Sequence, residues 1–354
     1  MRSFFSVFLI LTMIVSLTAC GGTVNASDSK AEPSAGEDQS AASGGVANDP
    51  KVFLVYAEVN PEGSLMGMTA QTFKTVAEEL SGGSITINVQ VGGVYGSEGD
   101  VLEDMISGGG ADIARISTMS LKGYDGISVT NLLSVPYIFS SREHFWATTD
   151  SYIGGEIKEE CFNAGLNIHG LFFVEEGFRH FFFKDEVTGI KDLQGLNIRV
   201  SSDTTSMGMV EGLGATPITV AFTEVYSALH SGAADAAEQP IVNYQSNAFH
   251  QAAPYMILDG HTLGSGMVII SDGAWNKLTA AQQDVLIQAG EAAGDYNRKN
   301  SAIIEQECRD ELEAAGVTFI DVEDKQPWRE VCVEIISEVT AGLEEYTSYI
   351  AGLE

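Results

Sequence analysis

The residues of this sequence that are best suited to bind a charged molecule lie within residues 171–250. Arg199 lies between Ile198 and Val200 at the end of a segment that is expected to be a buried strand, and Arg179 lies inside the aromatic run LFFVEEGFRHFFF. Positive charge is scarce, because the chain has 18 Lys+Arg against 49 Asp+Glu. A buried arginine is costly unless it meets an anion, and its guanidinium forms a bidentate pair with a carboxylate. The sequence therefore indicates that each arginine binds a carboxylate, which belongs either to the protein or to a ligand.

Two further side chains of this stretch could complete a ligand site. Gln239 is expected at the end of a strand, where its amide would supply another donor, and Phe222 precedes a helix that Thr223 is expected to cap. Open α/β sheets bind ligands beyond the carboxyl ends of their strands, and an aromatic ring there can cover the apolar body of a ligand. The alternative stays open, because an internal salt bridge is the more frequent use of an arginine in a chain this rich in carboxylates.

Signatures of catalysis, cofactor binding and metal binding are absent from the sequence. It has no GxSxG, GxxxxGK[ST], HExxH or EF-hand pattern, and its glycine runs SGGGAD and GSGM lack the GxGxxG spacing. The six histidines are scattered, with no pair at metal-ligand spacing. The sequence therefore favours a binding protein over an enzyme, and it predicts neither a cofactor nor a metal.

The elements that must position these residues follow an α/β pattern. Residues 52–59 and 84–91 read as strands, and the helix between them ends at Gly82-Gly83. The segments 101–116 and 225–240 share one plan, a short amphipathic helix, Ser-Gly, Ala-Asp and a short strand, which suggests two lobes built on similar units. The stretch after Thr279 has good helix formers and no proline up to about Ala315, which predicts one helix of about 50 Å that could brace both lobes.

The N-terminus carries the pattern of an exported, lipid-anchored protein. Arg2 is followed by an apolar run to about Leu17, which is shorter than the roughly 20 residues of a spanning helix. The run ends in Leu17-Thr18-Ala19-Cys20, which resembles a bacterial lipobox. We therefore expect a lipoprotein signal peptide over 1–20, lipid attachment at Cys20 and a flexible tether over 21–50. An ordinary secreted protein with a chance cysteine is the alternative.

Charge and cysteine content restrict the partners and the covalent links. A formal net charge of −31 argues against nucleic acid and against anionic lipid surfaces. Besides Cys20, the chain has Cys161, Cys308 and Cys332, with no CxxC motif. Export would permit a Cys308–Cys332 disulfide, and buried free thiols are the equally weighted alternative.

A resemblance to a known family is carried by residues 189–240, GIKDLQGLNIRVSSDTTSMGMVEGLGATPITVAFTEVYSALHSGAADAAEQP. This stretch resembles the signature region of the solute-binding proteins of TRAP (tripartite ATP-independent periplasmic) transporters, of the dicarboxylate-binding type. GGVYGSEGDVLEDMISGGGAD and LLSVPYIFSSREHF extend the resemblance over about 51–350. It implies an α/β, two-lobed, periplasmic-binding-protein-like clamp with crossing hinge strands and a long spanning helix. Lobe I is expected to comprise 51–176 plus 265–304, and lobe II 177–264 plus 305–354.

The resemblance also implies roles for single residues. Arg199 matches the main carboxylate clamp of the family, Arg179 an assisting arginine and Phe222 an aromatic residue of the cleft. Gln239 matches an amide that contacts the ligand or the arginine, and it is one methylene longer than the usual asparagine. The first lobe is expected to contribute four facing residues to the ligand site, namely Glu98, Ser117, Arg115 and Glu58.

By this resemblance, the function is that of an extracytoplasmic receptor that captures a small organic acid and delivers it to a TRAP-type membrane permease. The protein is expected outside the cytoplasm, anchored to the cell membrane by lipid. An ABC-type solute-binding lipoprotein is the main alternative, and a lipoprotein enzyme or an adhesive or sensory module comes after it. The long helix and the IRV…EQP signature disfavour the ABC type. Dicarboxylates, keto acids, sugar acids, aromatic acids and zwitterions all fit the clamp, and Glu58 or Glu98 would suit hydroxyls or a cationic group.

Overall fold

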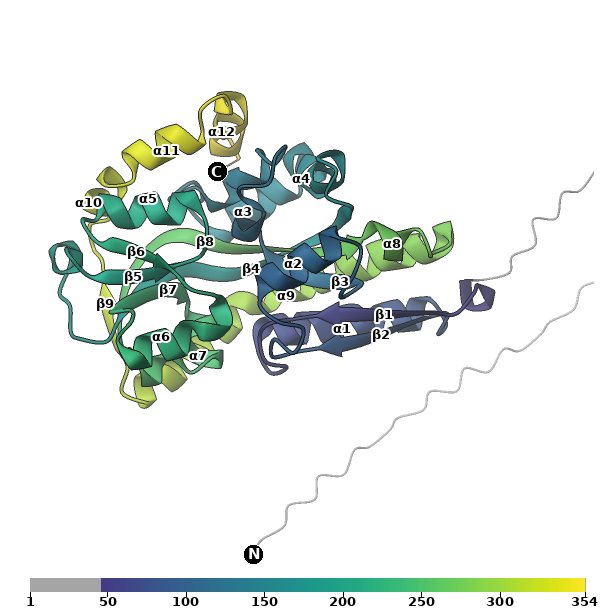
Figure 1. The fold of residues 1–354 in the computed structure, drawn as a ribbon, viewed down its shortest axis with the longest axis horizontal. Coiled ribbons are helices and arrows are strands. Elements are labelled where there is room, and N and C mark those ends of the chain that lie inside the picture. The colour runs from purple at the N-terminus through teal and green to yellow at the C-terminus, as the bar shows by residue number, and fades with distance from the viewer. Residues whose placement is uncertain (1–45, 354) are drawn as a thin grey trace, which may run out of the picture. The chain divides into compact units, whose positions relative to one another are not determined.

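The computed structural model describes residues 46–353, so the predicted signal peptide, Cys20 and most of the predicted tether lie outside the described residues. The described strands form one mixed sheet in the order β2-β1-β3-β8-β4-β7-β5-β6, with β9 paired to β8 (Figure 1). The strands are β1 (Val52–Ala57), β2 (Ile85–Gln90), β3 (Ile113–Ser117), β4 (Ile168–Phe183), β5 (Asn197–Val200), β6 (Thr216–Thr219), β7 (Ala236–Pro240), β8 (Tyr255–Ser271) and β9 (Thr318–Asp321).

Helices cover both faces of this sheet. The α-helices are α1 (Leu65–Leu80), α2 (Glu98–Ile106), α3 (Arg142–Thr149), α4 (Tyr152–Asn163), α5 (Thr204–Gly212), α6 (Val225–Ser231), α7 (Ile241–Ser246), α8 (Asp272–Trp275), α9 (Ala280–Ala314), α10 (Gln326–Glu330), α11 (Val333–Val339) and α12 (Glu344–Ala351). The 3-10 helices are η1 (Val46–Asn48), η2 (Thr118–Leu121), η3 (Thr130–Ser134), η4 (Ile190–Leu193), η5 (Phe222–Glu224) and η6 (Phe249–Gln251).

The two long strands β4 and β8 connect the two halves of the sheet. The first half contains β2, β1 and β3, and the second half contains β7, β5 and β6. Strands β4 and β8 pair antiparallel from Ile168↔Ser271 to Phe183↔Tyr255. Irregularities of register lie between Gly170 and Phe172, between Glu175 and Gly177, and between Arg179 and Phe181. Such bulges bend a strand and increase its twist. Strands β4 and β8 are the crossing strands expected from the sequence.

The two repeated helix–strand units flank these crossing strands symmetrically. In the first unit, β3 after α2 pairs antiparallel with β8 and parallel with β1. In the second, β7 after α6 pairs antiparallel with β4 and parallel with β5. Ser117 at the end of β3 pairs with Gly266, and Pro240 at the end of β7 pairs with Arg179. The carboxyl ends of both units therefore converge on the middle of β4 and β8.

Each half has an apolar cluster on each face of the sheet, because side chains alternate along a strand. Phe173 of β4 packs with α2, α3, α4 and α12, while Phe172 faces α1 and α9. Further along β4, Phe181 packs with α5, α10 and α11, while Phe182 faces α6, α7 and Leu312 of α9.

The long helix predicted after Thr279 is confirmed as α9, a single helix of 35 residues. Thr279 and Gln282 form a capping box at its start. Gly290 lies directly against Phe172, and a Cβ atom at this position would come within 2.8 Å of the ring. Helix α9 contacts α1 and β4 as well as α7, so it braces both halves.

Helix α12 falls within 305–354, which the sequence analysis assigned to lobe II. It packs on the first half, where Ile350 joins the cluster of α3 and α4 and its carbonyl bonds to His144 Nε2 at 2.7 Å. The boundaries of the lobes remain a prediction.

Cys308 and Cys332 are free thiols in different apolar clusters, Cys332 buried and Cys308 half-buried, so of the two equally weighted alternatives the free thiols hold and the disulfide is absent. One local prediction is wrong. Thr223 does not cap α6, because it lies inside η5 and α6 begins after Glu224 without a side-chain cap. Among residues 46–353, no helix is long and apolar enough to cross a membrane, and no three His, Cys, Asp or Glu side chains gather as metal ligands.

Candidate ligand-binding site

A cavity of about 260 Å³ opens where the carboxyl ends of β3, β5 and β7 meet the middle of β4. A volume of this order suits a small molecule. Seven of the eight side chains that the sequence analysis proposed line it, namely Glu98, Arg115, Ser117, Arg179, Arg199, Phe222 and Gln239. Glu58 does not line this cavity.

Arg199 of β5 is a buried cation without a carboxylate partner in the described part of the chain. Its side-chain Nε and Nη2 atoms donate to the carbonyl oxygen of Val220 at 2.9 and 2.7 Å. Its Nη1 atom is buried and has no hydrogen-bond partner. Burial, together with the nearby charge of Arg179, lowers the pKa of Arg199 to about 10 despite the opposing charge of Glu238. The internal salt bridge that the sequence left open for Arg199 is not found among residues 46–353.

Arg179 of β4, in contrast, already binds a carboxylate of the protein. Its Nε and Nη2 atoms pair with the two carboxylate oxygens of Glu238 on β7, Nη2 at 2.8 Å. Arg179 nevertheless lines the cavity, and its Nη1 atom makes no hydrogen bond with any described residue. Arg179 is thus held in place by Glu238 while one of its donors remains available.

Glu238 is itself held by a second buried charge. His261 Nε2 lies 3.5 Å from its Oε2, and His261 Nδ1 lies 2.6 Å from Asp259 Oδ2. Burial would raise the pKa of Glu238, but Arg179 and His261 outweigh it and lower the pKa to about 2. Burial would likewise lower the pKa of His261, but Asp259 and Glu238 raise it to about 9. Alternating charges therefore fix Arg179 against the wall of the cavity.

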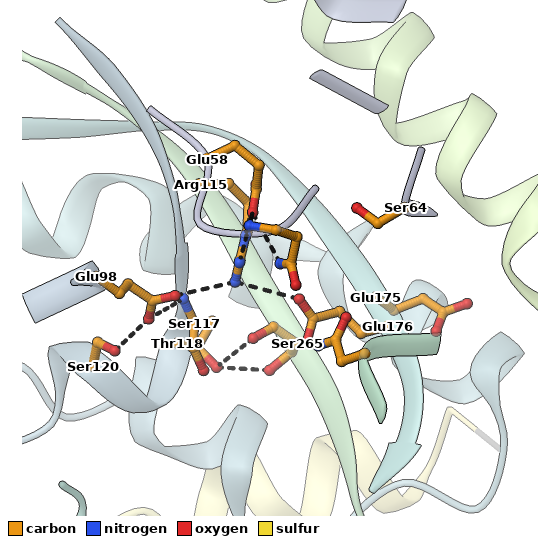
Figure 2. A network of polar contacts seen from close by, with 12 residues as sticks. Glu58, Ser64, Glu98, Arg115, Ser117, Thr118, Ser120, Glu175, Glu176 and Ser265 are labelled. Carbon is orange, nitrogen blue, oxygen red and sulfur yellow. Dashed lines mark hydrogen bonds and ion pairs between the residues drawn. The ribbon is translucent and has the colours of Figure 1, made fainter. Parts of the chain in front are cut away.

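The opposite wall is a cluster of three carboxylates around Arg115 of β3. Figure 2 shows Glu58, Glu98 and Glu176 arranged around this guanidinium. Nε and Nη2 donate to Glu58 at 3.2 and 3.0 Å, and Nη1 donates to Glu98 at 3.2 Å. Burial would lower the pKa of Arg115, but the three glutamates raise it well above its usual value. The guanidinium of Arg115 is therefore already paired with carboxylates of the protein.

Glu58 and Glu98 are positioned by the ends of neighbouring elements. Glu58 follows β1 directly and accepts from the backbone N and the side-chain Nδ2 of Asn60 at 2.8 and 2.9 Å. It lies buried behind Arg115. Glu98 is the first residue of α2, after the N-cap Ser97. It accepts from the backbone N of Ser117 at 2.8 Å and from Ser120 Oγ at 2.5 Å, which ties α2 to the end of β3.

The remaining predicted residues contribute polar and aromatic surface. Ser117 ends β3, and its Oγ accepts from the backbone N of Met119 at 3.3 Å. Gln239 is buried in β7, and its side-chain amide makes no hydrogen bond within residues 46–353. Phe222 begins η5 and meets Phe249 edge-on, with ring centres 5.8 Å apart. The cavity thus offers an amide and an aromatic ring beside Arg199.

Glu176 of β4 and Asn243 of α7 also line the cavity, and sequence reasoning missed both. Glu176 Oε2 accepts from Asn243 Nδ2 at 3.0 Å. Glu176 Oε1 lies 3.3 Å from Arg115 Nη1, without hydrogen-bond geometry. A signal existed for Glu176, because a carboxylate inside an apolar, buried run is as costly as the arginine three residues later.

Comparison with known proteins points to one family. The model of the bacterial extracellular solute-binding proteins of family 7 (DctP) matches residues 56–342. The 2,3-diketo-L-gulonate-binding periplasmic protein YiaO of Escherichia coli is 27% identical over 267 residues, which cover 73% of this chain and 78% of that protein.

Solved structures show the same architecture. A TRAP periplasmic solute-binding protein from Pseudomonas putida with bound D-glucuronate aligns with a TM-score of 0.81 at 28% identity, covering 85% of this chain and 97% of that one. Another, from a Bradyrhizobium species in complex with D-galacturonate, aligns with a TM-score of 0.80 at 27% identity, covering 84% and 99% of the two chains. These similarities confirm the predicted two-lobed α/β clamp.

Proposed function

Because the chain belongs to the bacterial extracellular solute-binding proteins of family 7, the dicarboxylate-binding-type receptors of TRAP transporters, we propose that it captures a small organic acid through Arg199 and delivers it to a TRAP-type membrane permease. The observation that carries this proposal is the guanidinium of Arg199, which lines the cavity and lacks an anion among the described residues. A buried cation of this kind is stabilised when a carboxylate enters.

The proposed clamp assigns a separate task to each residue. The ligand carboxylate takes the free Nη1 of Arg199, with further donors from Arg179 Nη1 and the Gln239 amide. Phe222 covers the apolar edge of the ligand. Arg115 and Glu98 shape the opposite wall together with Ser117. Glu58, which lies behind Arg115, positions that arginine and does not touch the ligand.

The ligand class that we propose is the sugar acids. The two solved structures described above hold D-glucuronate and D-galacturonate, and the relative from Escherichia coli is described as binding 2,3-diketo-L-gulonate. Each of these molecules joins a carboxylate to a polar, oxygen-rich body. The carboxylate suits Arg199, and the oxygen-rich body suits the glutamate wall around Arg115.

A thermal-shift series with these acids tests the proposal. D-galacturonate or D-glucuronate at about 100 times its Kd should stabilise the protein by roughly 2.7 kcal/mol, with the acid recovered unchanged. Neutral galactose at the same concentration is the control and should produce no shift. If no acid in a panel of sugar, keto, aromatic and dicarboxylic acids moves the melting temperature, the capture role fails; turnover of the acid would instead favour an enzyme. Uptake that needs ATP and not an ion gradient would contradict delivery to a TRAP permease.

We also propose that the receptor is held at the outer side of the cell membrane by lipid on Cys20. This residue lies outside the described residues, and the proposal rests on the Leu17-Thr18-Ala19-Cys20 pattern. Cys20→Ala should release the protein from membranes or leave the precursor unprocessed, because the thiol that carries the lipid is gone. Fractionation and mass spectrometry measure the outcome. A Cys20→Ala protein that is processed normally and stays membrane-bound would show that no lipid anchor forms here.

A further inference from the structure

The cavity is electrically polarised. On the β5 side, the charge of Arg199 has no carboxylate partner in the described residues, while the charge of Arg179 is neutralised by Glu238. On the β3 side, Arg115 is surrounded by three carboxylates, a formal excess of two negative charges. A small anion therefore has a favourable position at the first wall and an unfavourable one at the second.

Glu176 differs from the other two carboxylates of the cluster in one respect. Both oxygens of Glu58 and both oxygens of Glu98 accept hydrogen bonds from protein donors. Glu176 is 3% exposed and lines the cavity, and among residues 46–353 only its Oε2 accepts a hydrogen bond, from Asn243. Its buried Oε1 lies 3.3 Å from Arg115 Nη1 without hydrogen-bond geometry and accepts no hydrogen bond from a described residue. A buried acceptor without a donor is costly, so Oε1 is suited to a donor that arrives with the ligand.

We propose that Glu176 determines specificity: it accepts a hydrogen bond from a hydroxyl of the ligand and excludes acids that would place a second carboxylate beside it. This inference rests on the proposed function, because it assumes that one carboxylate of the ligand is held at Arg199. Two like charges a few ångströms apart repel each other, and they do so more strongly once the ligand has displaced water from between them. The cavity therefore selects polyhydroxy monocarboxylates over dicarboxylates of the same length.

The surroundings of Glu176 support this role. Burial raises the pKa of Glu176 against the opposing charges of Arg115 and Arg179, and a more basic carboxylate is a stronger acceptor. To bind a second carboxylate of the ligand with these atoms, Arg115 would have to break the hydrogen bonds that its Nε and Nη2 donate to Glu58. The dominant charge at this wall is therefore negative.

A matched set of sugar acids tests the proposal on the full chain. D-galactonate and galactarate share one carbon skeleton and one set of secondary hydroxyls, and galactarate replaces the terminal alcohol with a second carboxylate. Calorimetry should show that the tighter of D-galacturonate and D-galactonate binds at least about 30-fold better than galactarate, a difference of about 2 kcal/mol. In Glu176→Gln, which removes the charge and keeps the shape, this ratio should fall to about threefold or less, with galactarate binding more tightly than to the natural protein.

The controls separate this inference from the proposed function. Glu186→Gln, at an exposed glutamate, should keep the original ratio. If the natural protein binds galactarate as tightly as the better monocarboxylate, or if Glu176→Gln keeps the original ratio, Glu176 has no role in specificity while acid capture stands. If the natural protein binds none of the three acids, the sugar-acid assignment fails, and this inference fails with it. Should Glu176→Gln not fold, as judged by its melting curve, a natural protein that binds galactarate as tightly as the better monocarboxylate still overturns the inference.

Discussion

Replacing Arg199 with lysine is expected to weaken the binding of the cognate organic acid by about 2–4 kcal/mol. Lysine keeps the positive charge, but it lacks the planar guanidinium that can bind the Val220 carbonyl through Nε and Nη2 and offer Nη1 to the ligand carboxylate at the same time. It also loses the two bonds to the Val220 carbonyl that aim the guanidinium. Calorimetry with the best acid of the thermal-shift series measures the loss, and Arg199→Ala should bind more weakly still.

The same substitutions should leave the ligand-free protein folded and close to its original stability. Arg199 has no carboxylate partner in the described residues, and its Nη1 atom is buried without a hydrogen bond. Replacing Arg199 therefore leaves no described carboxylate without its partner. We expect the free energy of unfolding to change by no more than about 1 kcal/mol. Arg298→Lys is a matched control, because Arg298 is an exposed arginine that pairs with Asp150. Intact affinity together with a large fall in the apo melting temperature would mean that Arg199 is structural and that the ligand binds elsewhere.

Replacing Glu238 with glutamine is expected to lower the free energy of unfolding of the ligand-free protein by about 3–5 kcal/mol. The Arg199 substitutions, in contrast, should leave this stability almost unchanged. Glu238 is the only carboxylate that the described residues pair with Arg179, and it also faces His261. Glutamine would leave the guanidinium of Arg179 buried and unpaired. Urea unfolding followed by circular dichroism measures the change. Glu323→Gln, at an exposed glutamate, should have almost no effect.

The pH dependence of this loss has a definite sign. The pKa of Glu238 is lowered to about 2 from an ordinary value of 4.5, so its stabilising contribution is present above pH 4.5 and is lost as the pH falls through 2. At about 1.4 kcal/mol for each pH unit, this corresponds to about 3 kcal/mol. The pKa of His261 is raised from 6.5 to about 9, so its contribution is complete below pH 6.5 and is lost as the pH rises through 9. A gap between natural protein and Glu238→Gln that is unchanged from pH 7 down to pH 2 would contradict the pairing.

The two arginines illustrate why residue type alone does not assign a role. Both are buried, both line one cavity and both stand in apolar surroundings in the sequence. Arg179 is paired because the antiparallel register of β4 and β7 brings Glu238 to it across 59 residues. Arg199 lies on β5, and among the described residues only the backbone carbonyl of Val220 accepts hydrogen bonds from it. Sequence reasoning kept both possibilities open for both residues.

Local pattern was sufficient for much of this protein. The α/β order, the two similar helix–strand units and the single helix from 280 to 314 follow from periodicity and from the absence of helix breakers. The placement of seven predicted side chains around one cavity follows partly from a general property of α/β sheets, whose parallel strands end at a common edge, and partly from the family resemblance.

Tertiary structure alone decided how the charges of the cavity are distributed. Glu58 lies behind Arg115 and accepts hydrogen bonds from it, although the two residues are 57 positions apart in the sequence. Glu176 lines the cavity at a register irregularity of β4, between Glu175 and Gly177. The free thiols of Cys308 and Cys332 belong to separate clusters, although export would permit a bond between them. The physical reason is the same in each case. A salt bridge or a disulfide depends on distances of a few ångströms between distant segments, and strand register and sheet face set those distances, whereas the sequence encodes directly only the preferences of neighbouring residues.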